Sequence, residues 1–242
     1  MPSWLIAMHE SDINILNNIL KKNSNNSIAN TDLKSKANKH QKTILAIGCH
    51  PDDIEIGCGA TLAKHKMNGD IVHGLILTGG GQHGNPLIRE SEVRRAASIV
   101  GIKSLSFADL EDTYIFENLR ATILAIEALV KQINPDIVYS HSEHDRHQDH
   151  LGAFLATRVA CRRISQVLLY ETPSILPSFT PQIFVNVEDT IEKKLDAIRV
   201  YASQSSSYYM ECDLVEGLAK IRGYSQNVRF CEAFELLWIV LR

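Results

Sequence analysis

The sequence predicts an α/β fold of the doubly wound, Rossmann-like type, with a mainly parallel sheet, helices on both faces and a site at the carboxyl ends of the strands. Two observations predict it. From residue 43 onward, short apolar runs alternate with helical patterns, and strands separated by helices of about 10 to 15 residues pair in parallel through right-handed crossovers. Polar clusters directly follow two of the apolar runs, and in such sheets ligands bind beyond the carboxyl ends of the strands.

Residues 1–41 are predicted to be an N-terminal extension that ends in a polar linker. Apolar residues recur at near-helical spacing over 12–20, which indicates a short amphipathic helix. Residues 21–42 are rich in lysine and asparagine and hold few large apolar side chains, so they cannot bury enough surface to offset their ordering entropy. A basic arm that binds a partner is the alternative. Residues 42–242 are then expected to form a single α/β domain.

The first half of this domain is predicted to contain three strands and two helices. Residues 43–48 form a continuous apolar run, which is typical of a buried strand, and a helix is expected at 59–67. A second apolar run predicts a strand at 71–77. Residues 86–100 carry an apolar stripe at helical spacing, and 103–107 form a weaker strand. This order predicts parallel pairing of the strands.

The second half continues the alternation. Four large apolar side chains share one face of its first helix, namely Ile123, Ile126, Leu129 and Val130. The expected elements, in order, are helix 119–133, strand 136–140, helix 151–162, strand 167–170, strand 183–187 and helix 191–201.

Composition excludes several classes of protein. A chain of 242 residues that is 45% hydrophobic suits one α/β domain with a large core. With 25 Lys and Arg against 28 Asp and Glu, the net charge of −3 supplies no drive toward a phosphate backbone or an anionic membrane. No nucleic-acid partner is therefore expected. No apolar run approaches the roughly 20 residues that cross a bilayer, so no membrane span is expected either.

Cysteine usage points to a reducing compartment. The five cysteines are scattered, and their odd number does not suit the disulfide framework of a small secreted domain. The first residues do not resemble a secretory leader, so a cytoplasmic protein is expected. Cys49 and Cys58 lack C-x-x-C partners, and we expect small buried side chains rather than zinc thiolates. A homo-oligomer remains an open alternative to a monomer.

The first polar cluster follows strand 43–48. His50, Asp52 and Asp53 lie within four residues around Pro51. Adjacent carboxylates repel each other unless a cation or a proton neutralises them, so a metal ion or a raised pKa is expected. Pro51 fixes its own φ and keeps the preceding residue extended, which makes the turn rigid.

Two other interpretations of this cluster are weaker. One aspartate could simply cap the following helix, but this does not explain the whole string. A dinucleotide-binding loop could use Gly57 and Gly59. These glycines lie nine or more residues past the strand, the third glycine is absent, and the acidic pair would face the pyrophosphate.

The second cluster follows strand 136–140. Residues 141–150 hold four histidines and three acids. For His141 or His144 alone, a place in a solvated loop is the simpler interpretation. A catalytic zinc ion needs three protein ligands and an open position for water, and His50, an aspartate of the first cluster and a late histidine would supply such a set. The remaining imidazole and carboxylates would act as acid, base and supporting groups.

Together these residues resemble the PIG-L/LmbE-like family of zinc-dependent de-N-acetylases. The resemblance rests on two motifs and spans about residues 42 to 241. The motifs are His50-Pro51-Asp52-Asp53-x-Glu55-x-Gly57-Cys58-Gly59 and Asp145-x-His147-x-Asp149-His150. Looser similarities are Arg89-x-x-Glu92-x-x-x-Ala96, Leu110-Glu111-Asp112, Arg222-Gly223 and Glu232-Ala233-Phe234.

The resemblance implies roles for eight residues. It makes His50, Asp53 and His150 the ligands of one Zn²⁺ per chain, with another divalent ion as the alternative, and Asp52 the general base. It implies that His147 stabilises the oxyanion and protonates the leaving amine, with Asp149 orienting that ring and keeping it charged. It further implies that Arg89 and Asp112 bind substrate. For Arg89, a solvated position at the start of a helix is the competing interpretation.

The resemblance implies a hydrolase that uses metal-activated water to remove an N-acetyl group from a small amino-sugar-type substrate, such as a GlcNAc-containing glycoside or conjugate. Hydrolysis of another small amide is one alternative, and a non-catalytic zinc-dependent sugar-binding protein is another. The presence of Asp52 and His147 favours catalysis over binding.

Three departures from the family pattern are present. Gln148 replaces a common proline, and Asp145 stands where some members have a tyrosine, which removes a phenolic donor there. The loop 78–85 is unusually glycine-rich. Whether Asp145 or His83 takes part in the site stays open, as does the role of residues 205–209 at a sugar site.

Overall fold

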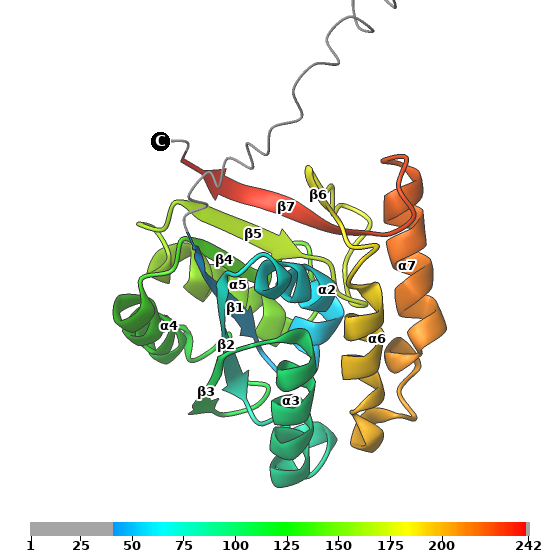
Figure 1. Ribbon diagram of the computed structural model, residues 1–242. Coiled ribbons are helices and arrows are strands. Elements are labelled where there is room, and N and C mark those ends of the chain that lie inside the picture. The colour runs from blue at the N-terminus through cyan, green and yellow to red at the C-terminus, as the bar shows by residue number, and fades with distance from the viewer. Residues whose placement is uncertain (1–40, 241–242) are drawn as a thin grey trace, which may run out of the picture. The chain divides into compact units, whose positions relative to one another are not determined.

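Seven strands form one mixed sheet in the computed structural model, which describes residues 41–240 (Figure 1). The strand order is β3-β2-β1-β4-β5-β7-β6. The bounds are β1 Thr43–Gly48, β2 Ile71–Thr78, β3 Ser104–Leu110, β4 Ile137–His141, β5 Gln166–Tyr170, β6 Ile183–Asn186 and β7 Cys231–Ile239. The five strands from β3 to β5 pair in parallel, whereas β7 runs antiparallel to β5 and β6. The mainly parallel α/β sheet predicted from sequence is confirmed.

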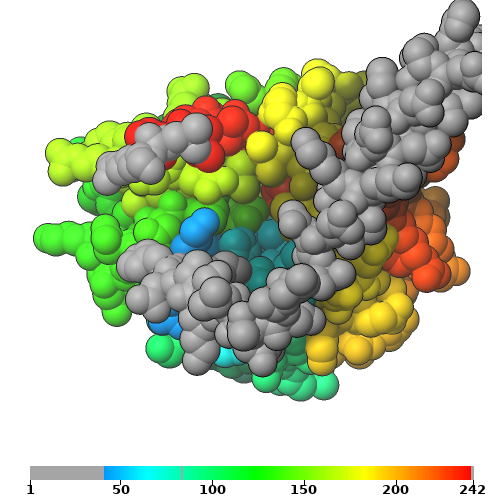
Figure 2. Space-filling view, turned by 45° about the horizontal axis from the view of Figure 1, so that its top comes forward, coloured from blue at the N-terminus to red at the C-terminus, as the bar shows by residue number. Residues whose placement is uncertain are grey.

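Helices cover both faces of the sheet, as the sequence predicts. Their bounds are α2 Asp53–Met67, α3 Pro86–Val100, α4 Leu119–Ile133, α5 Gln148–Ala160, α6 Ile191–Arg199 and α7 Cys212–Tyr224, with short 3₁₀ turns η1 Gly81–His83, η2 Ala202–Gln204 and η3 Tyr208–Met210. One apolar core lies between the sheet and α2, α3, α6 and α7, and a second lies under α4 and α5. The yellow and orange segments that include α6 and α7 lie side by side at the surface (Figure 2).

The largest differences between the structure and the predicted elements are two missed elements and the start of one helix. Helix α7 and strand β7 were not predicted, although motifs were noted within both. Helix α2 begins at Asp53 rather than at residue 59, and the predicted start coincides with a kink: Cys58 has the non-helical angles φ −147° and ψ 16°. The sequence pattern therefore located the second part of a broken helix.

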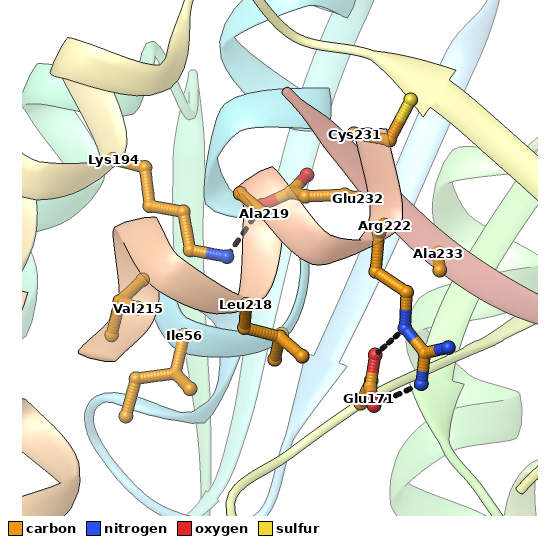
Figure 3. A pocket seen from close by; sticks show the side chains of 11 residues that line it. Ile56, Glu171, Lys194, Val215, Leu218, Ala219, Arg222, Cys231, Glu232 and Ala233 are labelled. Atoms are coloured by element: carbon orange, nitrogen blue, oxygen red, sulfur yellow. Dashed lines mark hydrogen bonds and ion pairs between the residues drawn. The ribbon is translucent and has the colours of Figure 1, made fainter. Parts of the chain in front are cut away.

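Glu232 of β7 caps the second part of α2. Its carboxylate accepts hydrogen bonds from the backbone N–H groups of Ala60 (3.1 Å) and Thr61 (2.6 Å), which directly follow the kink. Lys194 of α6 donates to the same carboxylate at 2.7 Å, and both side chains are buried (Figure 3). One carboxylate therefore joins α2, α6 and β7.

Gly57 lets the first part of α2 approach the sheet. A Cβ atom at this position would lie 2.2 Å from the ring of Tyr170 at the end of β5, closer than real contacts allow. The Tyr170 hydroxyl donates to the Ile47 carbonyl of β1 at 2.6 Å. Gly57 therefore permits a close approach of α2 to β5, while a Cβ at Gly59 would make only ordinary contacts.

The predictions for residues 1–40 lie outside the described residues, and so does the side chain of His83. Among the helices in residues 41–240, none combines the length and the apolar character that a bilayer crossing requires. Cys49 and Cys58 are fully buried, as expected.

Replacing Glu232 with glutamine is expected to lower the free energy of unfolding by about 3 kcal/mol, because removing one partner of a buried ion pair leaves an uncompensated charge at Lys194. Chemical denaturation measures this loss. The matched control is Glu192→Gln on the exposed face of α6, which should change stability by less than about 0.5 kcal/mol. Equal stabilities of the two variants would contradict the capping role.

Candidate functional site

The two polar clusters meet at the carboxyl ends of neighbouring strands. β1 pairs in parallel with β4, so the turn that follows β1 and the segment that follows β4 emerge at the same edge of the sheet. The loops after β2 and β3 join them there: the backbone N–H of Gln82 donates to Asp112 at 2.9 Å, and that of Thr113 donates to Asp149 at 2.8 Å. Residues far apart in sequence therefore enclose one site.

Asp52 occupies a strained backbone conformation that Arg89 supports. Its φ of 114° is in the left-handed region, which costs a residue with a side chain about 1–3 kcal/mol. The Arg89 guanidinium donates to the Pro51 carbonyl (2.7 Å), to Asp52 Oδ2 (3.1 Å) and to the Gly80 carbonyl (3.0 Å). Gly80 leaves room for this, because its Cβ would lie 2.0 Å from the guanidinium.

Asp53 is the carboxylate that connects the two clusters. Its Oδ2 accepts a hydrogen bond from the backbone N–H of His50 at 2.7 Å and lies 3.3 Å from His141 Nε2. Its Oδ1 lies 3.3 Å from His150 Nε2. The side chains of Asp53 and His150 are almost completely buried, so a carboxylate and an imidazole nitrogen face each other with little water between them.

Two further carboxylates lie against His50. Its Nε2 is 3.2 Å from Asp112 Oδ1 and 3.3 Å from Asp149 Oδ2. Asp149 is fully buried, and the backbone N–H groups of Thr113 and Ile115 hold its carboxylate.

The orientation of His147 differs from the one expected. The ring was expected to be held charged by the Asp149 carboxylate, but that carboxylate lies against His50. Instead the backbone N–H of Asp149 donates to His147 Nδ1 at 3.2 Å. An acceptor at Nδ1 places the ring proton on Nε2 and favours the neutral imidazole.

Within residues 41–240, four groups of side chains offer ligand atoms that lie within 4.8 Å of one another. One contains His50, His147 and His150, and another contains Cys49, Asp53 and His141. Asp53 contacts both His50 and His150. His150 Nε2 is buried and makes no geometrically acceptable hydrogen bond among the described residues. A buried nitrogen lone pair beside a carboxylate suits a divalent cation, so the donor set fits a metal ion of the zinc type.

The two adjacent aspartates have opposite pKa shifts. Burial, reinforced by the charge of Asp53, raises the pKa of Asp52 to about 7, against the opposing effects of Arg89 and nearby histidines. Burial would also raise the pKa of Asp53, but His150 and His141 outweigh it and hold that pKa well below its usual range. Opposite shifts in neighbouring acids are typical of catalytic sites.

The histidines of the site also have pKa values that are shifted in opposite directions. Burial lowers the pKa of His150, but Asp53 and Asp145 outweigh it and raise that pKa to about 9. Burial, with the charge of His150, lowers the pKa of His141 to about 4. Burial and the nearby His150 and His50 also lower the pKa of His147.

His141 corrects one expectation. A solvated loop was the simpler interpretation, yet its side chain is 0% exposed, contacts Asp53 and stacks on His150 with ring centroids 4.0 Å apart. His144, by contrast, is partly exposed and pairs with Glu235. The competing interpretation of Arg89 as a solvated residue is also wrong, since it is 3% exposed. Its predicted contact with substrate stays a prediction.

The sequence of this chain is similar to those of known deacetylases. A family model described as "PIG-L: GlcNAc-PI de-N-acetylase" matches residues 45–161, which include both clusters. The uncharacterized deacetylase YaiS of Escherichia coli is 42% identical over 183 residues, which cover 73% of this chain and 98% of that protein. The diacetylchitobiose deacetylase of Thermococcus kodakarensis is 27% identical over 222 residues, covering 78% of this chain and 83% of that protein.

A solved structure shares the fold. The crystal structure of a conserved protein from Thermus thermophilus superimposes with a TM-score of 0.76 at 26% identity, covering 84% of this chain and 97% of that chain. The Rossmann-like arrangement predicted from the sequence is therefore confirmed.

Glu55 is a buried acid that should make the stability of the protein depend on pH. It is 0% exposed, accepts a hydrogen bond from Tyr201 at 2.9 Å, and burial raises its pKa from 4.5 to about 7. A raised pKa means that folding favours the protonated acid, so this residue's contribution to stability falls as pH rises from about 4.5 to about 7. In chelator-treated protein, the free energy of unfolding of Glu55→Gln should therefore rise relative to that of the parent by about 3 kcal/mol as the pH increases from about 4.5 to about 7.

Urea denaturation at several pH values measures the difference between Glu55→Gln and the parent. For the exposed control Glu192→Gln, the free energy of unfolding should differ from that of the parent by the same amount at every pH. A Glu55→Gln curve that also runs parallel would contradict the assignment of a neutral, buried acid at this position.

Proposed function

Because the chain belongs to the PIG-L family of deacetylases, we propose that it is a zinc-dependent hydrolase that removes an N-acetyl group from an amino-sugar-type substrate. One observation carries the proposal: His50, Asp53 and His150 converge beside a second buried carboxylate, Asp52, whose pKa is near neutral. A relative at 27% identity is a diacetylchitobiose deacetylase, which supports a GlcNAc-containing glycoside or conjugate as the substrate class.

His50, Asp53 and His150 would hold the zinc ion. Two imidazoles and one carboxylate are a ligand set that leaves a position open for water. Zinc, when bound, acidifies water and polarises the amide carbonyl. The neighbouring acids Asp112 and Asp149 would hold the His50 ring in place, since groups that hydrogen-bond to a metal ligand fix its orientation.

Asp52 would be the general base. It follows His50 by two residues and lies outside the set of carboxylates that contact the histidines. A pKa of about 7 in the metal-free site lets it take up and return a proton near neutral pH. Arg89 holds both its carboxylate and its backbone turn, so the base keeps its direction while water attacks the amide carbon.

His147 would stabilise the oxyanion, and Asp52 would return to the leaving amine the proton that it takes from water. Its Nδ1 accepts from the Asp149 N–H, which leaves Nε2–H as a hydrogen-bond donor. The ring lies 5.0 Å from that of His50 and 4.5 Å from that of His150, centroid to centroid. A donor so close to the metal ligands suits the oxygen that becomes negative when water adds to the carbonyl. The C–N bond then breaks, the amine takes the proton that Asp52 removed from water, and acetate is the second product.

Replacing Asp52 with asparagine is expected to lower acetate release by at least about 100-fold, because general bases contribute factors of this size. Zinc content should stay at the parent's value, since Asp52 is not among the proposed ligands. The assay measures acetate released from N-acetylglucosamine, diacetylchitobiose and a simple N-acetyl amide. Asp213→Asn, at an exposed position of α7, serves as the matched control and should match the parent.

Two results would contradict the proposal. Zinc-replete parent protein that releases no acetate from any of these compounds would exclude the substrate class. Full activity in Asp52→Asn would exclude Asp52 as the base.

A further inference from the structure

We propose that Asp145 is a positioning residue that fixes the ring of His150 for metal binding and that Thr172 and Ser174 hold it in this orientation. The inference rests on the proposed function only in taking His150 as a metal ligand. It gives a role to Asp145, which stands where some family members have a tyrosine, and to the loop that follows β5.

The Asp145 carboxylate makes four hydrogen bonds. Its Oδ2 lies 2.8 Å from His150 Nδ1 and accepts from the Thr172 hydroxyl. Its Oδ1 accepts from the His147 backbone N–H at 2.9 Å and from the Ser174 hydroxyl at 2.6 Å. Two partners on each oxygen, in a residue that is 4% exposed, leave the carboxylate no freedom to rotate.

This geometry determines which nitrogen of His150 is available. The three other partners of Asp145 are all hydrogen-bond donors, so its carboxylate is an acceptor in each of these contacts. An ionised carboxylate only accepts, so His150 Nδ1 must carry the proton. The lone pair of the neutral ring then lies on Nε2, the buried atom that faces Asp53. A carboxylate behind a histidine ligand in this way sets the ring's tautomer and raises its basicity.

The loop after β5 anchors this arrangement. Asp145 pairs with Ile175 in an antiparallel bridge. The backbone N–H of Arg146 donates to the Ser174 carbonyl at 3.2 Å, and that of Leu176 donates to the His144 carbonyl at 2.7 Å. Two hydroxyl groups and a short backbone pairing thus connect the loop 171–182 to the proposed metal ligand His150.

A purely structural role for Asp145 is the competing explanation, since its carboxylate also shapes the turn before α5 through the His147 N–H. The two explanations differ in what they predict for the metal. A structural residue changes stability, whereas a positioning residue also changes zinc affinity and the spectrum of the His150 ring.

The test is zinc affinity, measured without substrate by competition with a chelating dye. Asp145→Asn is expected to bind zinc about 10- to 100-fold more weakly than the parent. Glu232→Gln is the matched control: it also removes a buried, fully hydrogen-bonded carboxylate, but it lies at the cap of α2. It should lose stability and keep the parent's zinc affinity. An affinity of Asp145→Asn within about twofold of the parent's would overturn the inference.

Two further measurements keep the inference testable if Asp145→Asn does not fold. The double variant Thr172→Val/Ser174→Ala retains the carboxylate but loses both hydroxyl anchors, and it should bind zinc at least about threefold more weakly. In the zinc-loaded parent, ¹⁵N spectra of labelled histidine should show His150 protonated at Nδ1 and bound through Nε2. Unchanged affinity of the double variant would remove the anchoring role, and binding through Nδ1 would overturn the inference as a whole.

The role of Asp145 and the proposed deacetylase activity can fail separately. A parent that binds zinc tightly but releases no acetate would contradict the deacetylase proposal, while the affinities would still decide the role of Asp145.

Discussion

The site depends on one contact: the Asp53 carboxylate lies between His50, just after β1, and two histidines at and beyond the end of β4, His141 and His150. β1 and β4 pair in parallel, so the turn after β1 and the segment after β4 meet at one edge of the sheet. Asp53 accepts the His50 backbone N–H and faces His141 and His150. Four more aspartates, which are Asp52, Asp112, Asp145 and Asp149, crowd the same region. Such a density of buried negative charge requires cations, and protonated histidines or a bound metal ion supply them.

The supports of this contact come from distant parts of the chain. Arg89 of α3 stabilises the left-handed backbone at Asp52, and Gly80 makes room for its guanidinium. Loops after β3 and β5 hold Asp149 and Asp145 in turn. Each support forms hydrogen bonds with buried polar groups. Ordering these groups costs free energy during folding, and once formed they fix the direction of the functional side chains.

Much of the fold and of the site could be predicted from the sequence, because both rest on local patterns. The apolar runs located five parallel strands, and polar clusters at their ends located the site. The capped kink at Cys58 could not be predicted, since the capping carboxylate of Glu232 lies 172 positions from Ala60 along the chain. Burial of His141 was also missed, because it depends on Tyr170 and His150 packing against the ring. The role of the Asp149 backbone at His147 follows from the first turn of α5, which residue types alone do not reveal.

The central claim is that the two clusters form a single metal centre. Anomalous diffraction at the zinc edge, from crystals of the zinc-loaded protein, tests it most directly. The account predicts one zinc ion per chain, bound by His50, Asp53 and His150 through its Nε2 nitrogen, with Asp52 beside it and outside the ligand set. A zinc ion bound instead by Cys49 and His141, which with Asp53 also form a compact donor group, would contradict it, as would no ordered zinc between the two clusters.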